Sequence, residues 1–479
     1  MGWLLPNVAA KEPARCWSPW VCLFIIFTGV FFALFYVVLN PPSGELPSLS
    51  SGYWLPLTVT TFTGIAVTIT FYSLWWEIQS VVVWNWNTWR RNMNILWRKR
   101  AHQHLFIAHH LFQSADPQQL TRIAGVGQDN DNEKMFLNLL PDKPITPGII
   151  RFEQLCQVML NELKQPLLRQ YSSGNLRVLV QSSGADKSEE LQSFNQLWAA
   201  ASLPWNADIH VLSAGLPFDD WNKNVVTSRI PVLVLALHYR QPEELLPEFV
   251  SALLLMPQAL LHSAKSHKEI RLFRAMSLNT ASLKSELADL KTMGQQPVKN
   301  KYVVWHSGLA NVPRQIAGKV LNELSFPLED DIGTGGIIDY DQKFAAYRGL
   351  TGWAMTAAAA EMASYHSESQ LLLCEDEDAA WAIVLGKSSP VASADINPLS
   401  SPFPLGSLML ALLFNAGLYS LMLKFSPVVA HSWSGVMVLI LSLAVTLPGV
   451  AFLLRYVIAH LQRSQFRKAA SQSGKESPV

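Results

Sequence analysis

Four long apolar stretches constrain the fold of this 479-residue chain more than any other feature. They cover residues 17–39, 54–76, 405–423 and 435–454, and none of them contains Asp, Glu, Lys or Arg. A helix needs about 20 residues to cross a bilayer, so each stretch is long enough to span a membrane. The sequence therefore predicts a membrane protein with two N-terminal and two C-terminal transmembrane helices, each pair forming a hairpin.

A cleaved signal peptide is the alternative interpretation of the first stretch. The apolar core of a signal peptide is typically about 7–15 residues long. Residues 17–39 exceed that length, and a second apolar stretch begins at Trp54. These two features favour a membrane-spanning helix over a signal peptide.

Basic residues predict the orientation of the hairpins. Lys and Arg accumulate on the cytoplasmic side of membrane spans, whereas the loop of residues 40–53 carries only Glu45 as a charge. If every stretch crosses the membrane, the three basic clusters lie on one side. We therefore expect a bacterial inner-membrane protein with both termini and the central segment in the cytoplasm. The residues of these clusters are Lys11, Arg15, Arg90, Arg91, Arg98, Lys99, Arg100, Arg455, Arg463, Arg467 and Lys468.

The segment of residues 83–100, "VWNWNTWRRNMNILWRKR", mixes tryptophans with basic residues directly after the second stretch. Tryptophan rings suit the membrane interface, and arginines reach anionic lipid headgroups. An ordinary amphipathic helix and nucleic-acid stacking are the alternatives. The net charge of +1 gives no general support for nucleic-acid binding. The predicted interface residues are Trp84, Trp86, Trp89, Arg90, Arg91, Trp97, Arg98, Lys99 and Arg100.

Two parts of the central segment, residues 176–260 and 301–390, share one order of predicted elements. Each reads strand, helix, strand, helix, strand, strand, from the alternation of β-branched apolar runs with helical periodicity. The first strands, "LRVLVQSSG" and "KYVVWHSG", both end in Ser-Gly. This common order predicts a duplicated α/β domain.

The remaining segments connect these parts. Residues 77–175 are expected to form a juxtamembrane helix and a helical connector, with residues 101–114 continuing the helix. Residues 261–300 are expected to form a helical bridge between the halves. Residues 1–16 and 455–479 are the predicted cytoplasmic N-terminus and basic tail. The histidines of "AHQHLFIAHH" would not stack on one helical face, so no metal site is predicted there, and the cysteine spacing predicts neither a zinc site nor a disulfide framework.

The duplicated layout resembles the thiolase-like fold of β-ketoacyl synthases. "AAYRGLTGWAMTAAAAEMA" is similar to the buried glycine- and alanine-rich helix of the second half of a synthase, and "CEDEDAAWAIVLG" to its closing hairpin. The resemblance implies two such halves packed in five layers of helices and sheets.

The resemblance also locates candidate catalytic residues. "HVLSAGLPFDDW" matches the region of the nucleophilic cysteine, but only Ser213 could replace that cysteine. "VVWHSG" matches the strand that carries the first catalytic histidine, which makes His306 the second candidate. The second histidine would fall near "YRGLTG", which contains none.

These departures favour a non-catalytic membrane-anchored scaffold or accessory protein. Its cytoplasmic thiolase-like domain would bind partner proteins, for example in a bacterial secretion machine of the type VI kind. The alternative is a membrane-bound acyl-handling enzyme, an acyltransferase or condensing-type enzyme acting on lipid or acyl-carrier substrates. A transporter is less favoured, because no apolar stretch carries a charge of the kind that marks an ion path. No cofactor is predicted; the expected partners are anionic lipid, unidentified proteins and a second copy of the chain.

Overall fold

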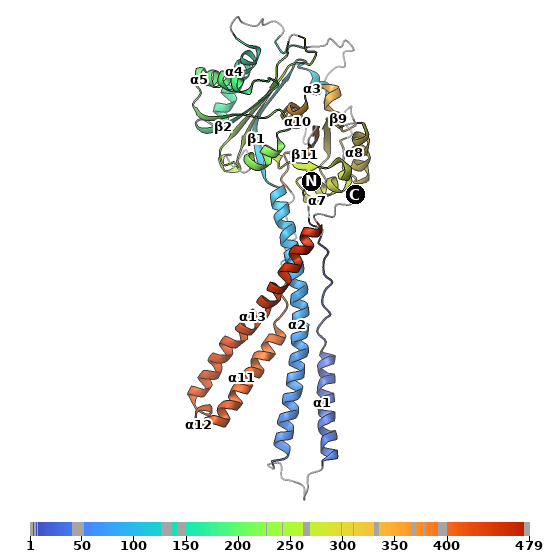
Figure 1. The fold of residues 1–479 in the computed structure, drawn as a ribbon, viewed down its shortest axis with the longest axis vertical. Coiled ribbons are helices and arrows are strands. Elements are labelled where there is room, and N and C mark those ends of the chain that lie inside the picture. The colour runs from blue at the N-terminus through green and yellow to red at the C-terminus, as the bar shows by residue number, and fades with distance from the viewer. Residues whose placement is uncertain are drawn as a thin grey trace. The chain divides into compact units, whose positions relative to one another are not determined.

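The computed structural model forms two compact units, and the ribbon in Figure 1 shows the elements of each. One unit comprises mainly Ile95–Ala394, and the other Pro6–Asn94 together with Asp395–Glu476. The structure describes residues 3, 6, 8–40, 52–125, 137–140, 149–226, 228–241, 243–261, 269–297, 299–309, 311–329, 335–365, 369–376, 379–390 and 400–473.

The first helical hairpin is α1 (Pro19–Leu39) and α2 (Trp54–Ala101). The second is α11 (Leu405–Phe425) and α13 (Trp433–Ser473), joined through the short α12 (Pro427–Ala430). Among the described residues, these four long helices are long and apolar enough to cross a membrane, as the sequence predicts.

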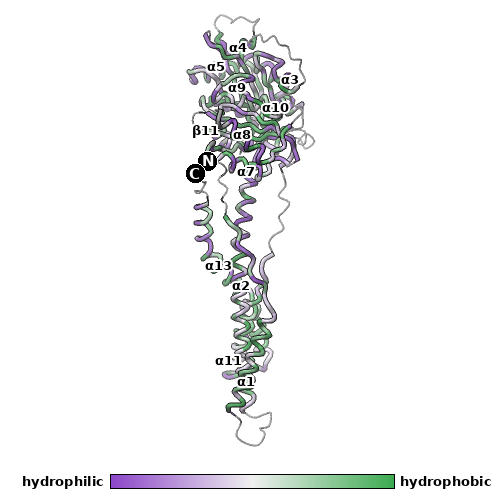
Figure 2. The backbone as a smooth tube through the Cα atoms, turned by 90° about the vertical axis from the view of Figure 1, so that its right-hand side faces the viewer, coloured by the Kyte–Doolittle hydropathy of each residue, from purple (hydrophilic) through white to green (hydrophobic). Residues whose placement is uncertain are grey.

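Two of these helices are much longer than a membrane is thick. At 1.5 Å per residue, the 48-residue α2 is about 72 Å long, whereas the hydrocarbon core measures about 30 Å. Figure 2 shows the change from hydrophobic to hydrophilic residues along α2 and α13. The predicted juxtamembrane helix is therefore the polar continuation of α2.

The second hairpin packs against α2 where α11 begins. The Glu77 carboxylate accepts hydrogen bonds from the backbone N–H (2.7 Å) and the hydroxyl (2.9 Å) of Ser407. A Cβ atom on Gly406 would lie 2.4 Å from the Leu74 Cα atom, so the backbones approach closely here. Farther along, Gln462 of α13 donates to the Val82 carbonyl at 3.2 Å. These contacts fix the register of the two hairpins.

The strands of the other unit form a single mixed sheet with eleven strands in the described residues. Their order is β3-β2-β4-β5-β1-β6-β11-β10-β8-β9, and β7 pairs with β11. The strands are β1 (His104–Ser114), β2 (Gly174–Ser182), β3 (Trp205–Val211), β4 (Val232–His238), β5 (Phe249–Met256), β6 (Ile270–Phe273), β7 (Met276–Leu278), β8 (Tyr302–Ser307), β9 (Ile337–Asp339), β10 (Ser369–Asp376) and β11 (Ala379–Gly386).

The sheet consists of two halves with the same topology. In the first half β2, β3 and β4 are parallel, β5 is antiparallel to β4, and β1 flanks β5. In the second half β8, β9 and β10 are parallel, β11 is antiparallel to β10, and β6 flanks β11. The antiparallel pair β1–β6 joins the halves. This arrangement confirms the predicted duplication and is consistent with a thiolase-like fold.

Helices cover both sheet halves and lie between them. The outer helices α4 (Arg151–Gln170) and α5 (Lys187–Ala200) bury apolar residues against the first half of the sheet. The outer helices α7 (Leu283–Met293) and α8 (Asn311–Glu323) pack against the second half. The alanine-rich α10 (Thr351–Tyr365) contacts β1, β4 and β5 of one half and β6, β8 and β10 of the other. Its small side chains let a helix fit between two sheet surfaces. Shorter helices are α3 (Gln119–Ile123), α6 (Phe218–Asp220) and α9 (Tyr340–Lys343).

Two predicted helical segments are wrong. Residues 101–114 do not continue the helix, because α2 ends at Ala101 and β1 begins at His104, between β5 and β6. The predicted helical bridge contains β6 and β7, and α7 is its α-helix in the described residues. In both places apolar runs form strands whose partners lie far away in the sequence. Periodicity is read within a short sequence window, so it does not show such distant pairing.

Candidate functional site

His306 lies in β8 on the face that α8 covers. Its neighbours Val303 and Trp305 contribute to the core around α10, whereas Val304 contributes to the core beneath α7 and α8. Side chains alternate along a strand, so the His306 ring shares the outer face with Val304. His306 is 6% exposed, and burial lowers the pKa of its imidazole.

Charged residues surround His306 on this outer face. Asp339 of β9 is its partner in the strand register, and Arg314 of α8 forms an ion pair of 2.6 Å with Asp339. The nearby Asp339 carboxylate opposes the effect of burial on the pKa of His306. This arrangement is a buried polar cluster between a strand and its covering helix.

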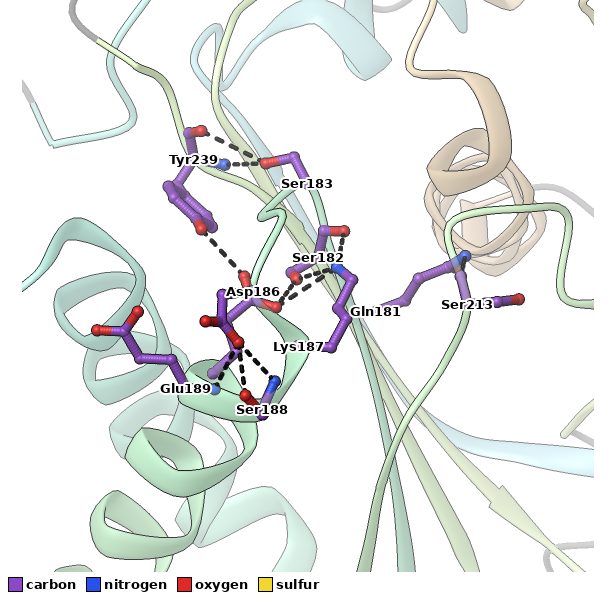
Figure 3. A network of polar contacts seen from close by, with 10 residues as sticks. Gln181, Ser182, Ser183, Asp186, Lys187, Ser188, Glu189, Ser213 and Tyr239 are labelled. Carbon is purple, nitrogen blue, oxygen red and sulfur yellow. Dashed lines mark hydrogen bonds and ion pairs between the residues drawn. The ribbon is translucent and has the colours of Figure 1, made fainter.

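Ser213 lies in the exposed loop that follows β3. Its backbone carbonyl accepts a hydrogen bond of 2.9 Å from the Gln181 amide, and Gln181 also bonds to the Gly215 carbonyl. A Cβ atom on Gly349 would lie 1.9 Å from the Ala214 carbonyl oxygen, so this loop packs on the side of the sheet that carries α10. In Figure 3 the Ser213 hydroxyl points away from Lys187 and Tyr239.

The structure therefore does not bring Ser213 and His306 into one site. The serine loop lies on the α10 side, and the histidine lies beneath α8. Within the described residues, neither the Ser213 hydroxyl nor the His306 ring makes a hydrogen bond. A serine needs a base within hydrogen-bond reach to act as a nucleophile, and His306 cannot supply one from the outer face.

Two cysteines of the domain are also poor nucleophiles. Cys156 of α4 and Cys374 of β10 are at most 1% exposed, and burial raises the pKa of both thiols. The thiolate is the reactive form of cysteine, so both side chains are suited to packing.

A polar network in the first half was not predicted from the sequence (Figure 3). Glu190 of α5 is 3% exposed, yet it accepts hydrogen bonds from the Tyr239 hydroxyl (3.0 Å) and from Ser182. Lys187 donates to the Ser182 carbonyl (2.8 Å) and hydroxyl (2.9 Å). Burial and the adjacent Glu190 carboxylate raise the pKa of Tyr239. The sequence signal near this network is the Ser183-Gly184 pair just after β2, whose counterpart in the second half is Ser307-Gly308.

The predicted membrane-interface residues all lie on α2. Trp86 and Trp89 contact the Phe466 ring of α13 edge-on, with centroid distances of 5.2 and 5.6 Å. The Trp86 ring also lies under the Lys11 ammonium, at 4.5 Å. Trp97 packs against the core of the α/β unit, with Arg100 over its ring at 5.5 Å. These tryptophans have partners within the protein, and their contact with lipid remains a prediction.

The fold defines a class: a duplicated mixed α/β domain in a chain whose described residues include four helices long and apolar enough to cross a membrane. No protein-family model matches the sequence, and no curated protein sequence matches it.

Solved structures of OleA from Xanthomonas campestris are similar to the chain at a low level. The acetamide-bound structure has a TM-score of 0.36 and 10% sequence identity, covering 59% of this chain and 98% of its own. A cerulenin-bound structure has the same TM-score, identity and coverage. A second cerulenin complex again has a TM-score of 0.36 and 10% identity, covering 59% and 96% of the two chains. Likeness at this level carries no argument about activity.

Proposed function

We propose that this protein is a non-catalytic membrane-anchored scaffold whose α/β domain faces the bacterial cytoplasm and binds partner proteins. The observation that carries the proposal is the separation of Ser213 from His306 by the second half of the sheet. The buried thiols of Cys156 and Cys374 support it, because they leave no reactive cysteine in the described α/β domain.

The helical unit supports the anchoring part of the proposal. Four helices in the described residues are suited to crossing a bilayer, and the basic residues concentrate beside them on the side predicted to be cytoplasmic. Anchoring by several helices holds a domain at the membrane surface, where it meets other membrane-bound proteins at raised local concentration.

The test of the proposal compares turnover with partner capture. The full-length protein in detergent would be incubated with acyl-carrier and acyl-CoA thioesters, and released thiol and acylated protein would be measured. We expect neither released thiol nor acylated protein above the level of a control without the protein. Turnover that is lost in Ser213→Ala or His306→Ala would contradict the proposal and establish an acyl-handling enzyme.

Partner capture tests the scaffold itself. Crosslinking in intact cells before detergent extraction should return the same partner proteins with wild type and with both alanine variants, because neither residue is needed for binding. Repeated recovery of the protein alone would count against a scaffold.

A further inference from the structure

The turn between α11 and α13 exposes large apolar side chains. It lies at the tip of the second helical hairpin and contains the short helix α12 (Figure 1). Phe425, Val428 and Trp433 are each at least 73% exposed, and Val429 is exposed beside them. Exposed apolar side chains that gather in one place mark a surface that contacts a membrane or another protein.

The turn carries no formal charge. Residues 425–434 contain no Asp, Glu, Lys or Arg. The nearest charged residue is Lys424 at the end of α11, whose ammonium lies over the Phe425 ring at 5.5 Å. In contrast, residues 40–53 between α1 and α2 include Glu45 and are rich in proline, serine and glycine. An uncharged apolar turn beside one lysine suits the membrane interface, where the lysine can extend to the lipid headgroups.

Polar groups of the turn bond within the protein. The Ser426 N–H donates to the Met422 carbonyl (2.8 Å), and the Ala430 N–H donates to the Ser426 carbonyl (3.0 Å). The Ser432 hydroxyl donates to the Val429 carbonyl (2.6 Å). Lipid chains offer no hydrogen bonds, so a segment that enters them must satisfy its polar groups internally. These bonds therefore suit the turn to an environment with little water.

The turn is also tightly packed. A Cβ atom on Gly435 would lie 2.2 Å from the Val429 carbonyl oxygen, and Ala430 is buried. The start of α13 therefore lies directly against the turn. This close approach fixes the backbone that carries the exposed Val428 and Trp433 side chains.

The length of α11 places the turn at the edge of the hydrocarbon core. Its 21 residues span about 31 Å, and the core of a bilayer is about 30 Å thick. Ser407 in the first turn of α11 bonds to Glu77, the first charged residue after the apolar stretch of α2. A helix of this length that begins at one boundary of the core ends at the other, and a tilt would keep its end inside. Phe425 and the turn therefore reach the far lipid interface without passing beyond it.

We propose that the turn of residues 425–434 is an interfacial anchor in the leaflet opposite the basic clusters. It inserts Phe425, Val428 and Trp433 at the boundary between acyl chains and headgroups, and Lys424 contacts lipid phosphate groups.

Continuity with the helices favours lipid over a protein as the occupant of this surface. The exposed apolar side chains of the turn extend those of α11 and α13, among them Phe414, Leu421 and Ile440. This inference goes beyond the proposed scaffold function and depends only on α11 and α13 crossing a bilayer.

Spin-label accessibility in lipid nanodiscs tests the anchor. The full-length protein would be reconstituted in phosphatidylethanolamine and phosphatidylglycerol, with Cys16 and Cys22 replaced by serine. The remaining thiols, Cys156 and Cys374, are buried and do not take up the label.

Three single-cysteine variants carry the label. Val428→Cys reports on the turn, Phe414→Cys on the middle of α11, and Gln192→Cys on an exposed position of α5 in the α/β unit. Collisions are measured with oxygen, which concentrates in the hydrocarbon core, and with a water-soluble nickel chelate.

We expect the Val428 label to lose most of its collisions with the nickel chelate relative to the Gln192 label, while it retains collisions with oxygen. Nickel collisions at the level of Gln192 would overturn the proposal. Protection from both agents would overturn it too, because a partner protein or a second copy would then cover the turn. A Phe414 label that the nickel chelate reaches would contradict the membrane span on which the inference depends.

Matched variants identify the side chains that hold the turn in the interface. Val428→Ser combined with Trp433→Ser should increase nickel collisions of a label at Val429→Cys, because the anchoring apolar groups are lost. Leu245→Ser removes an exposed apolar side chain of the α/β unit and should leave these collisions unchanged. Equal collisions in both variants and in the parent protein would contradict the proposed anchor.

Discussion

The Glu77 carboxylate caps the N-terminus of α11 by accepting both hydrogen bonds that Ser407 can donate to it, across a sequence separation of 330 residues. Glu77 is fully buried in the helical unit. The first N–H groups of a helix lack partners within the helix, and a carboxylate at this end also interacts favourably with the helix dipole. This contact therefore attaches the second hairpin to α2.

Removal of this carboxylate should loosen the second hairpin. We expect Glu77→Ala to destabilise the helical unit by about 1–3 kcal/mol, because a buried N–H and a buried hydroxyl lose their acceptor. The measurement is the thermal unfolding midpoint in detergent, together with spin-label distances between α2 and α11. Glu12→Gln, an exposed carboxylate of the same unit, is the control. Equal midpoints for both variants would contradict the role of Glu77.

The close approach of α11 to α2 predicts that Gly406 cannot be enlarged. Gly406→Ala would place a Cβ atom 2.4 Å from backbone atoms of Leu74, so the helices must separate. Gly417→Ala in the same helix meets nothing within 4 Å. We expect the first variant to lower the unfolding midpoint and the second to raise or preserve it, because alanine favours a helix. The reverse order would show that the two helices do not pack at Gly406.

The α/β unit offers a similar comparison at Gly308. Gly308 has a φ of +74° and a carbonyl oxygen 1.8 Å from the position of a Cβ atom, whereas Gly335 has a φ of +63° and open space around it. We expect Gly335→Ala to cost about 1 kcal/mol from backbone strain alone. Gly308→Ala should cost about 3 kcal/mol or more, since the strands β8 and β10 must also move apart. Denaturant unfolding of the two variants would measure this difference, and equal costs would contradict the tight contact.

Acidification should weaken the attachment of α10 to β1. His110 lies 3.1 Å from the Glu361 carboxylate, and this hydrogen bond lowers the pKa of Glu361. A folded-state pKa below the unfolded value of about 4.3 gives a stabilisation that is present above that pH and is lost as the pH falls through the folded-state pKa.

The corresponding variant is Glu361→Gln. It should lower stability by about 0.5–1 kcal/mol at pH 7, because the pair is partly exposed, and by less at pH 3.5. Thermal unfolding of the variant and wild type at both pH values checks this, with Glu243→Gln, an exposed loop carboxylate of the same unit, as the control. A difference that grows on acidification would contradict the sign of the pKa shift.

The sequence predicted the features that depend on local composition. The four apolar stretches and strands such as β4 and β8 have strong signals of length and β-branched content. It failed for β1, because "HLFIAHHLF" directly follows a long helix and its partners β5 and β6 are far away in the chain. Glu77 was also missed: a single carboxylate after an apolar stretch carries no signal for a partner such as Ser407.

The candidate site residues also show that local sequence patterns do not reveal contacts between distant segments. Local motifs selected Ser213 and His306, but their distance depends on which face of a strand each occupies and on which layer covers it. The polar network of Glu190 and Tyr239 depends on the pairing of β2 with β4 and on Gly184, where a Cβ atom would lie 2.0 Å from the Glu190 carboxylate. Such relationships arise from packing between distant segments, and a single sequence does not encode them in any local pattern.

Protease accessibility in cells measures on which side of the membrane the α/β domain lies. Trypsin would be added to intact spheroplasts and, separately, to inside-out membrane vesicles, and fragments would be detected with antibodies against residues 149–390. We expect an intact domain in spheroplasts and digestion in the vesicles. Digestion in intact spheroplasts would place the domain outside the cell and contradict a cytoplasmic scaffold.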